Sequence, residues 1–222
     1  MLQQALTLIR DPSTEYAAHS WQYITLCLTA VLLAIAVGVP LGVLVARRPV
    51  AAFLATNTSG LVRAIPSIVF LVLFIPYLGI GYRPAIFALT VLGIPPILLN
   101  TIAGLRGLDP AAIDAAHGMG MTPWQVLARI QIPLVLPVVA AGVRTAAVQI
   151  VATGTLAGVF GAGGWGEYIY LGIFRGGDLA YILIGAVPVM LLALVVELGL
   201  GASERALTPA GLRAGVAVAA AP

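Results

Sequence analysis

Residues 21–46 read WQYITLCLTAVLLAIAVGVPLGVLVA, a run without a single charged side chain. A helix of that length rises about 39 Å, which is enough to cross a hydrocarbon core of roughly 30 Å with some tilt. The run is too long for a cleaved signal peptide, and the segment before it is not basic. We therefore predict a membrane-spanning helix here.

The composition of the whole chain indicates a polytopic membrane protein. Hydrophobic residues make up 61% of the 222 positions, charged residues only 9%, and the mean hydropathy is +1.07. A soluble domain carries about 25% charged residues, and a chain with so few cannot cover itself with a polar surface. The net charge of +3 is too small to predict a nucleic-acid-binding face, so no nucleic-acid partner is expected. The single cysteine, Cys27, excludes an internal disulfide.

The apolar runs predict an all-α transmembrane bundle of about five spans. The predicted spans are residues 21–46, 64–80, 84–104, 132–159 and 179–200. Between the first two spans, residues 47–63 are interpreted as a short loop. Within residues 1–18, three apolar side chains recur at helical spacing, which indicates a short extracytoplasmic helix at the membrane surface. Residues 205–222 form the predicted cytoplasmic tail.

The arginines predict the orientation of the bundle. With five spans, seven of the eleven arginines fall on one side of the membrane and three on the other, and one lies within a span. The positive-inside rule places the seven-arginine side in the cytoplasm. The prediction is therefore a multi-pass protein of a prokaryotic plasma membrane, with its amino terminus outside and its carboxyl terminus inside.

The longest polar interruption, residues 105–131, carries the functional signal. From Leu108 to Pro133 the chain reads LDPAAIDAAHGMGMTPWQVLARIQIP. Asp109-Pro110 and Thr122-Pro123 each predict a helix start, because Asp or Thr can cap free amides and proline fits the first helical position. Two short helices, the first with very small side chains, fit a groove on another protein, but they would equally cover the bundle. Periodicity alone does not decide between these alternatives.

This stretch resembles the EAA loop of the membrane subunits of ABC importers. The family pattern is an acidic residue, two alanines, three residues, a glycine, nine residues, and I-x-L-P. The matching positions in this chain are Asp114, Ala115, Ala116, Gly120, Ile130, Ile132 and Pro133. Aspartate stands where glutamate is usual and isoleucine where leucine is usual.

The resemblance implies a type I ABC-importer transmembrane domain over residues 19–204. In that family the loop docks into a cleft on a cytoplasmic ATPase, so Asp114, Ala115, Ala116 and Gly120 are expected to dock. Met121 and Trp124 are expected to pack the loop against the membrane domain. The implied partners are ATPase subunits, an extracytoplasmic substrate-binding protein, a second permease subunit and membrane lipid.

The chain is most similar to permeases for osmoprotectants such as glycine betaine, choline, carnitine or proline betaine. The strings that favour this subfamily are Leu99-Asn-Thr101 and Gly142-Val-Arg144, whereas the glycine-rich residues 161–166 are also similar to methionine permeases. A permease for methionine or another amino acid, and a secondary transporter, remain alternatives. An intramembrane hydrolase is disfavoured because the only histidines, His19 and His117, form no recognisable catalytic or metal-binding cluster.

No catalytic residue, metal site or cofactor is expected in this chain. It contains no lysine and therefore no G-x-x-x-x-G-K-[ST] phosphate loop. ATP and Mg²⁺ are expected to bind the partner ATPase instead.

Several polar residues within or near the predicted spans are candidates for a solute pathway or gate. Arg144 is the most informative, because a charge inside a span is costly and usually faces the bundle interior, water or a counter-charge, for which Glu197 is the candidate here. The other candidates are Ser67, Asn100, Thr101 and Thr153. Packing hydrogen bonds between helices explain these residues equally well.

Aromatic residues follow the fourth span, on the predicted outer side. They are Trp165, Tyr168, Tyr170 and Phe174. An interfacial aromatic belt is the favoured interpretation, and cation–π binding of a quaternary ammonium group is the alternative.

Overall fold

The computed structural model describes residues 2–11 and 14–208, and within these ranges every regular element is a helix. The predicted tail lies outside the described residues from position 209 onward. The elements are α1 (Leu2–Arg10), α2 (Tyr16–Ala46), α3 (Pro49–Ala64), α4 (Ser67–Leu78), α5 (Tyr82–Arg106), α6 (Pro110–Gly118), α7 (Pro123–Val126), η2 (Leu127–Gln131), α8 (Ile132–Val159), α9 (Trp165–Phe174) and α10 (Leu179–Leu207).

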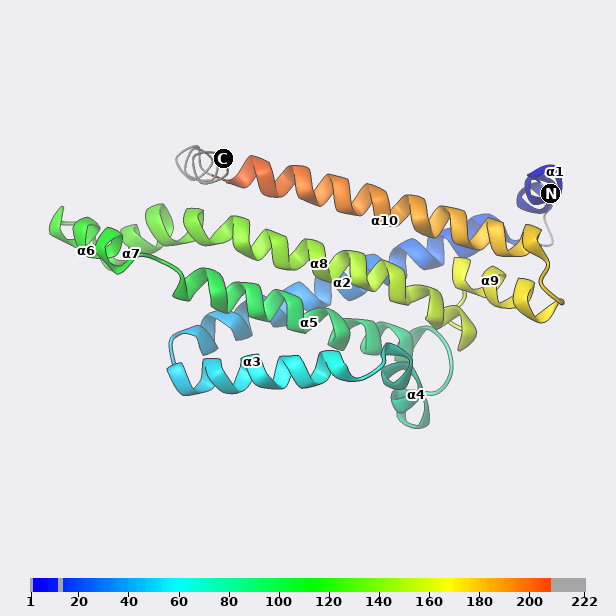
Figure 1. The fold of residues 1–222 in the computed structure, drawn as a ribbon, viewed down its shortest axis with the longest axis horizontal. Coiled ribbons are helices and arrows are strands. Elements are labelled where there is room, and N and C mark those ends of the chain that lie inside the picture. The colour runs from blue at the N-terminus through cyan, green and yellow to red at the C-terminus, as the bar shows by residue number, and fades with distance from the viewer. Residues whose placement is uncertain (1, 12–13, 209–222) are drawn as a thin grey trace, which may run out of the picture.

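Four helical segments are long and apolar enough to cross a membrane. They are α2 with 31 residues, α5 with 25, the continuous run Pro123–Val159 with 37, and α10 with 29. The bent pair α3 and α4 supplies a fifth crossing if the two helices are counted together. Figure 1 shows α2, α3, α5, α8 and α10 running along the long axis of the molecule. The all-α bundle of four to five spans agrees with the sequence prediction.

The structure differs from the prediction between the first and third spans. Residues 49–64, interpreted mostly as a loop, form the 16-residue helix α3, which starts with Pro49 at its first turn. The helix ends because Pro66 disfavours helical geometry at Ile65, whose backbone is extended. The chain then turns by 91° into α4. With 12 residues, α4 rises about 18 Å, too short to cross a core of roughly 30 Å alone, so residues 64–80 are not one straight span.

Small residues allow the long helices to approach one another closely. A Cβ added at Gly42 of α2 would lie 2.5 Å from the Cβ of Thr101 on α5. A Cβ at Gly142 of α8 would lie 2.7 Å from the Cβ of Asn100, also on α5. Helices in lipid gain little from the hydrophobic effect and associate through such close contacts. These glycines therefore fix α5 between α2 and α8.

The two ends of the bundle carry different elements. In Figure 1, α6, α7 and the end of α10 lie at one end of the long axis, and α1 and α9 lie at the other. The described chain therefore starts and finishes at opposite ends of the bundle, as an odd number of crossings requires.

Candidate functional site

The helix α6 begins and ends through the local interactions that its sequence predicts. The amide of Ala111 donates to Asp109 Oδ1 at 2.9 Å, and Pro110 occupies the first turn. At the other end, the amides of Gly120 and Met121 donate to the carbonyls of His117 and Ala116, at 2.9 and 3.2 Å. This pair of bonds is a Schellman motif, which needs a residue with positive φ. Gly120 supplies it with φ of +78°.

The second short helix starts with a capping box and continues into the membrane. The amide of Thr122 donates to Gln125 Oε1 at 2.8 Å, and the amide of Gln125 donates to Thr122 Oγ1 at 3.4 Å. From Pro123 the helical run continues through the π-helical turn η2 into α8, as far as Val159. This part of the loop is therefore continuous with a membrane-crossing helix.

The exposure of the loop side chains agrees with only part of the predicted docking set. Ala115, Asp114 and Gly120 are exposed, and a Cβ added at Gly120 would meet nothing within 4 Å. Ala116, in contrast, is only 1% exposed. Its small side chain faces the interior of this chain, and in this conformation it offers no surface to a docking protein. This burial differs from the exposure that docking requires, and the docking role of Ala116 stays a prediction.

Trp124 also differs from expectation. We predicted that it packs the loop against the membrane domain, but its side chain is 72% exposed. Val126, which is 1% exposed, takes the inward position on the same short helix. Helical geometry explains this, since residues two apart do not share a face. Met121, Ile130 and Pro133 are half-buried, and their predicted roles remain predictions.

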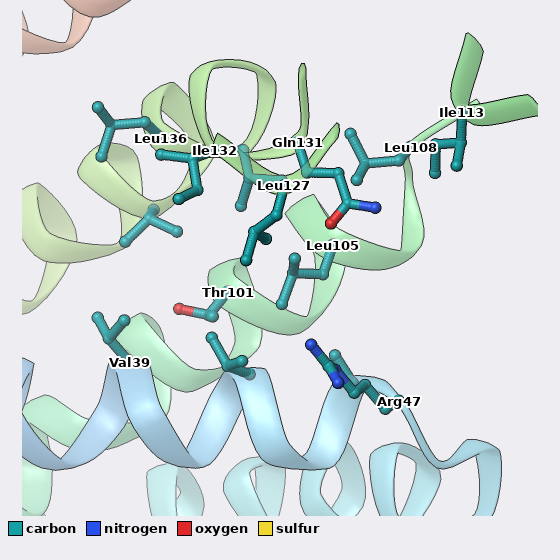
Figure 2. A pocket seen from close by; sticks show the side chains of 14 residues that line it. Val39, Arg47, Thr101, Leu105, Leu108, Ile113, Leu127, Gln131, Ile132 and Leu136 are labelled. Carbon is teal, nitrogen blue, oxygen red and sulfur yellow. The ribbon is translucent and has the colours of Figure 1, made fainter. Parts of the chain in front are cut away.

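An apolar cavity of about 560 Å³ lies between the loop and the bundle. Its walls come from α2, α5, α6, η2 and α8 (Figure 2). Figure 2 shows Thr101 and Leu105 on one wall, Leu127 and Gln131 on another, and Arg47 extending from the end of α2. The cavity therefore touches both the loop and the helices to which the loop is joined.

Arg144 connects α8 to α10. Its Nη1 atom lies 3.7 Å from Glu197 Oε1 and 3.3 Å from Glu204 Oε2. The predicted partner Glu197 is therefore present, and Glu204, seven residues further along the same helix, is a second partner that the sequence analysis missed. Gly201 lets the guanidinium approach, because a Cβ there would lie 3.1 Å from Nη1. The three side chains form an ion-pair cluster with one excess negative charge.

The remaining pathway candidates are not gathered into one site. Asn100 Nδ2 donates to the carbonyl of Pro96, and Thr101 Oγ1 donates to that of Ile97, both at 2.8 Å. Both residues also form the close helix contacts described above, which favours packing roles. Ser67 begins α4, and Thr153 lies half-buried on α8. Of the five candidates, Thr101 is the one that lines the cavity in Figure 2.

At the opposite end of the bundle, α9 is held against α2 by polar contacts. Trp165 Nε1 donates to Ser20 Oγ at 2.8 Å, and the amide of Gly164 donates to His19 Nδ1 at 3.1 Å. Tyr168 donates its hydroxyl to the carbonyl of Thr14 at 2.7 Å. Burial raises the pKa of Tyr168, with smaller contributions from neighbouring acidic groups, so its hydroxyl stays a donor.

This arrangement corrects the interpretation of the aromatic residues as a single belt. Trp165 and Tyr168 are 7% and 3% exposed, and they pack within the bundle rather than against lipid. Their burial removes these two rings as open faces for a quaternary ammonium group in this conformation. Phe174, at 73% exposure, remains available to an interface. In the described part of the chain, no group of three or more His, Cys, Asp or Glu could hold a metal ion.

The fold and the loop define a class: a helical membrane subunit with a projecting, capped helical loop joined directly to a spanning helix. Residues 38–209 match the sequence profile of the family described as "Binding-protein-dependent transport system inner membrane component". The chain belongs to this family. It is therefore a multi-pass permease subunit of a binding-protein-dependent ABC transporter.

Curated relatives match over nearly their full length. The carnitine transport permease protein OpuCB of Listeria monocytogenes is 42% identical, covering 94% of this chain and 95% of that protein. The choline transport system permease protein OpuBB of Bacillus subtilis is 40% identical, covering 90% and 91%. The osmoprotectant import permease protein OsmW of Salmonella typhimurium is 39% identical, covering 91% and 96%.

The fold is also similar to a solved structure. A chain of the MetNI methionine ABC transporter in an inward-facing conformation superposes with a TM-score of 0.75 and is 25% identical. The match covers 87% of this chain and 96% of that chain.

Proposed function

We propose that this chain is the permease subunit of an ATP-driven importer for osmoprotectants of the glycine betaine, choline and carnitine class. The observation that carries the substrate class is the identity of 39–42% to permeases named for carnitine, choline and osmoprotectants, over at least 90% of the chain. The sequence strings around Asn100 and Arg144 favour the same subfamily.

The projecting loop is the proposed contact for a partner ATPase. Its outward face carries Asp114, Ala115 and the open space beside Gly120. Few side chains protrude there, so another protein can pack closely against this surface. Trp124 extends from the same loop and adds a large exposed side chain of the kind that anchors interfaces. ATP binding and hydrolysis belong to that partner, and this chain transmits the movement through the continuous helix Pro123–Val159.

The rest of the assembly follows from the same proposal. The loop faces the cytoplasm together with the end of α10, and the end that carries α1 and α9 faces outward. An extracytoplasmic substrate-binding protein delivers solute at that outer end. A second permease subunit, identical or related, completes the pathway by covering part of the large apolar surface of the spanning helices. The assembly then alternates between inward- and outward-facing states.

The direct test is uptake of labelled glycine betaine, choline, carnitine and methionine in a bacterial strain that lacks its own importers for these solutes. The strain carries this chain with its cognate ATPase and binding protein. The proposal expects ATP-dependent uptake of at least one quaternary ammonium solute that unlabelled methionine does not inhibit. Uptake of methionine alone would favour the second candidate function, a methionine permease, which the structural similarity to MetNI supports.

A further inference from the structure

The cavity behind the loop is polar at one end and apolar at the other. Arg47 and Gln131 lie toward the loop, whereas Val39 and Leu136 lie toward the middle of the bundle (Figure 2). Val39 precedes Arg47 by eight helical residues, so the two ends are about 12 Å apart along α2. The volume of about 560 Å³ is within the range of ligand sites, roughly 300–1,000 Å³.

Arg47 is placed to bind an anion at the mouth of this cavity. Its side chain lines three hollows at this end of the bundle: the apolar cavity, a second hollow shared with Arg48, and a third beside Trp124. Among the described residues, no carboxylate lies within ion-pairing distance of its guanidinium. An unpaired cation at the end of a spanning helix is therefore left for a ligand.

We propose that this cavity binds an anionic phospholipid, with an acyl chain between α2, α5 and α8 and the headgroup phosphate on Arg47. The chemistry on both sides is complementary. The apolar walls replace lipid contacts for the acyl chain, and basic pockets between membrane helices are known to hold anionic headgroups. A soluble anion would make no favourable contact with the apolar walls, and a zwitterionic lipid would gain less electrostatic binding energy from the guanidinium of Arg47.

The position of the site between the loop and the bundle means that a bound lipid would affect their relative movement. The cavity walls include Ile113 of α6 and Leu127 of η2, as well as residues of the spanning helices. A bound acyl chain therefore fills the space between the loop and the bundle and limits movement of one against the other. The inference requires that α2 crosses the membrane and ends at Arg47, and it does not depend on which solute is transported.

The test is lipid retention by the full-length chain, purified with its partner subunits from an equal mixture of phosphatidylglycerol and phosphatidylcholine and measured by native mass spectrometry. One guanidinium at a membrane surface predicts roughly a fivefold preference for phosphatidylglycerol. Arg47→Gln is expected to abolish that preference. Arg83→Gln removes the same charge at the opposite end of the bundle and is expected to leave it unchanged.

A second variant tests the acyl-chain part of the site. Val139→Trp fills the cavity and is expected to reduce retention of both lipids. An unchanged preference in Arg47→Gln would overturn the proposal, and so would unchanged retention in Val139→Trp. A complex that retains neither lipid would assign the cavity to a protein segment of a partner subunit and would also contradict the proposal.

Discussion

The turn at Gly120 gives a sharp prediction about coupling to the ATPase. Its φ of +78° lies in the left-handed region, while the space beside it is empty. An alanine there meets no steric clash within this chain, but its backbone conformation costs about 1–2 kcal/mol. An energy of that size lowers the ratio of native to non-native turns by a factor of roughly 5–30. Gly120→Ala is therefore expected to weaken binding of the ATPase subunit by up to that factor, which is reached if the native turn is only marginally stable in the free chain.

Two matched variants separate backbone strain from added bulk. Gly118 also faces open space but has no positive φ, so Gly118→Ala adds the same methyl group without this strain. Gly120→Asn enlarges the side chain but uses a residue that tolerates left-handed geometry, and its effect is expected to be smaller than that of alanine.

The assay measures the affinity of each purified variant for the ATPase, together with solute uptake per ATP hydrolysed in proteoliposomes. Equal losses in Gly118→Ala and Gly120→Ala would refute the argument from backbone strain. Wild-type affinity and coupling in Gly120→Ala would refute the importance of the turn itself.

Three further changes are expected to lower the thermal stability of the purified chain, measured by unfolding in detergent. Arg144→Gln leaves Glu197 and Glu204 without their cation and is expected to cost about 1–2 kcal/mol of stability. That cost lies between the values for exposed and buried ion pairs, because these side chains are a quarter to a half exposed. Arg144→Lys keeps the positive charge and should restore part of the loss. Gly166→Ala forces a methyl group onto the carbonyl of residue 155 and costs about 1–3 kcal/mol, whereas a stability equal to wild type would show that α9 does not pack as described. Trp165→Phe removes the hydrogen bond to the hydroxyl of residue 20 and also some buried ring volume; the hydrogen-bond part of the cost is about 1 kcal/mol, and that part alone should vanish in a chain already lacking that hydroxyl.

The sequence predicted those features that depend on local chemistry. The helix starts at Asp109-Pro110 and Thr122-Pro123 are capped in the structure as their residue types require. The pairing of Arg144 with Glu197 followed from the cost of a lone charge in a span. These predictions succeeded because each involves either a few consecutive residues or one strong energetic penalty.

The errors concern features that depend on the surroundings. The helix α3 was missed because Thr56, Asn57, Thr58 and Ser59 lower its hydropathy, although Pro49 at its start was a usable signal. The inward position of Ala116 and the outward position of Trp124 depend on how the loop sits on the bundle, which periodicity over such short helices does not determine. Glu204 was missed because it lies beyond the predicted end of the last span at residue 200.

The central claim is that the loop of residues 109–130 faces the cytoplasm and contacts an ATPase, and thiol labelling tests it directly. Ala112 is exposed on α6, and Cys27 is buried, so Ala112→Cys in a Cys27→Ser background provides one reactive thiol within the chain. The account predicts that a membrane-impermeant maleimide labels it in inverted vesicles but not in intact cells, and that bound ATPase protects it. Labelling in intact cells, or labelling in inverted vesicles that the ATPase does not reduce, would contradict the account.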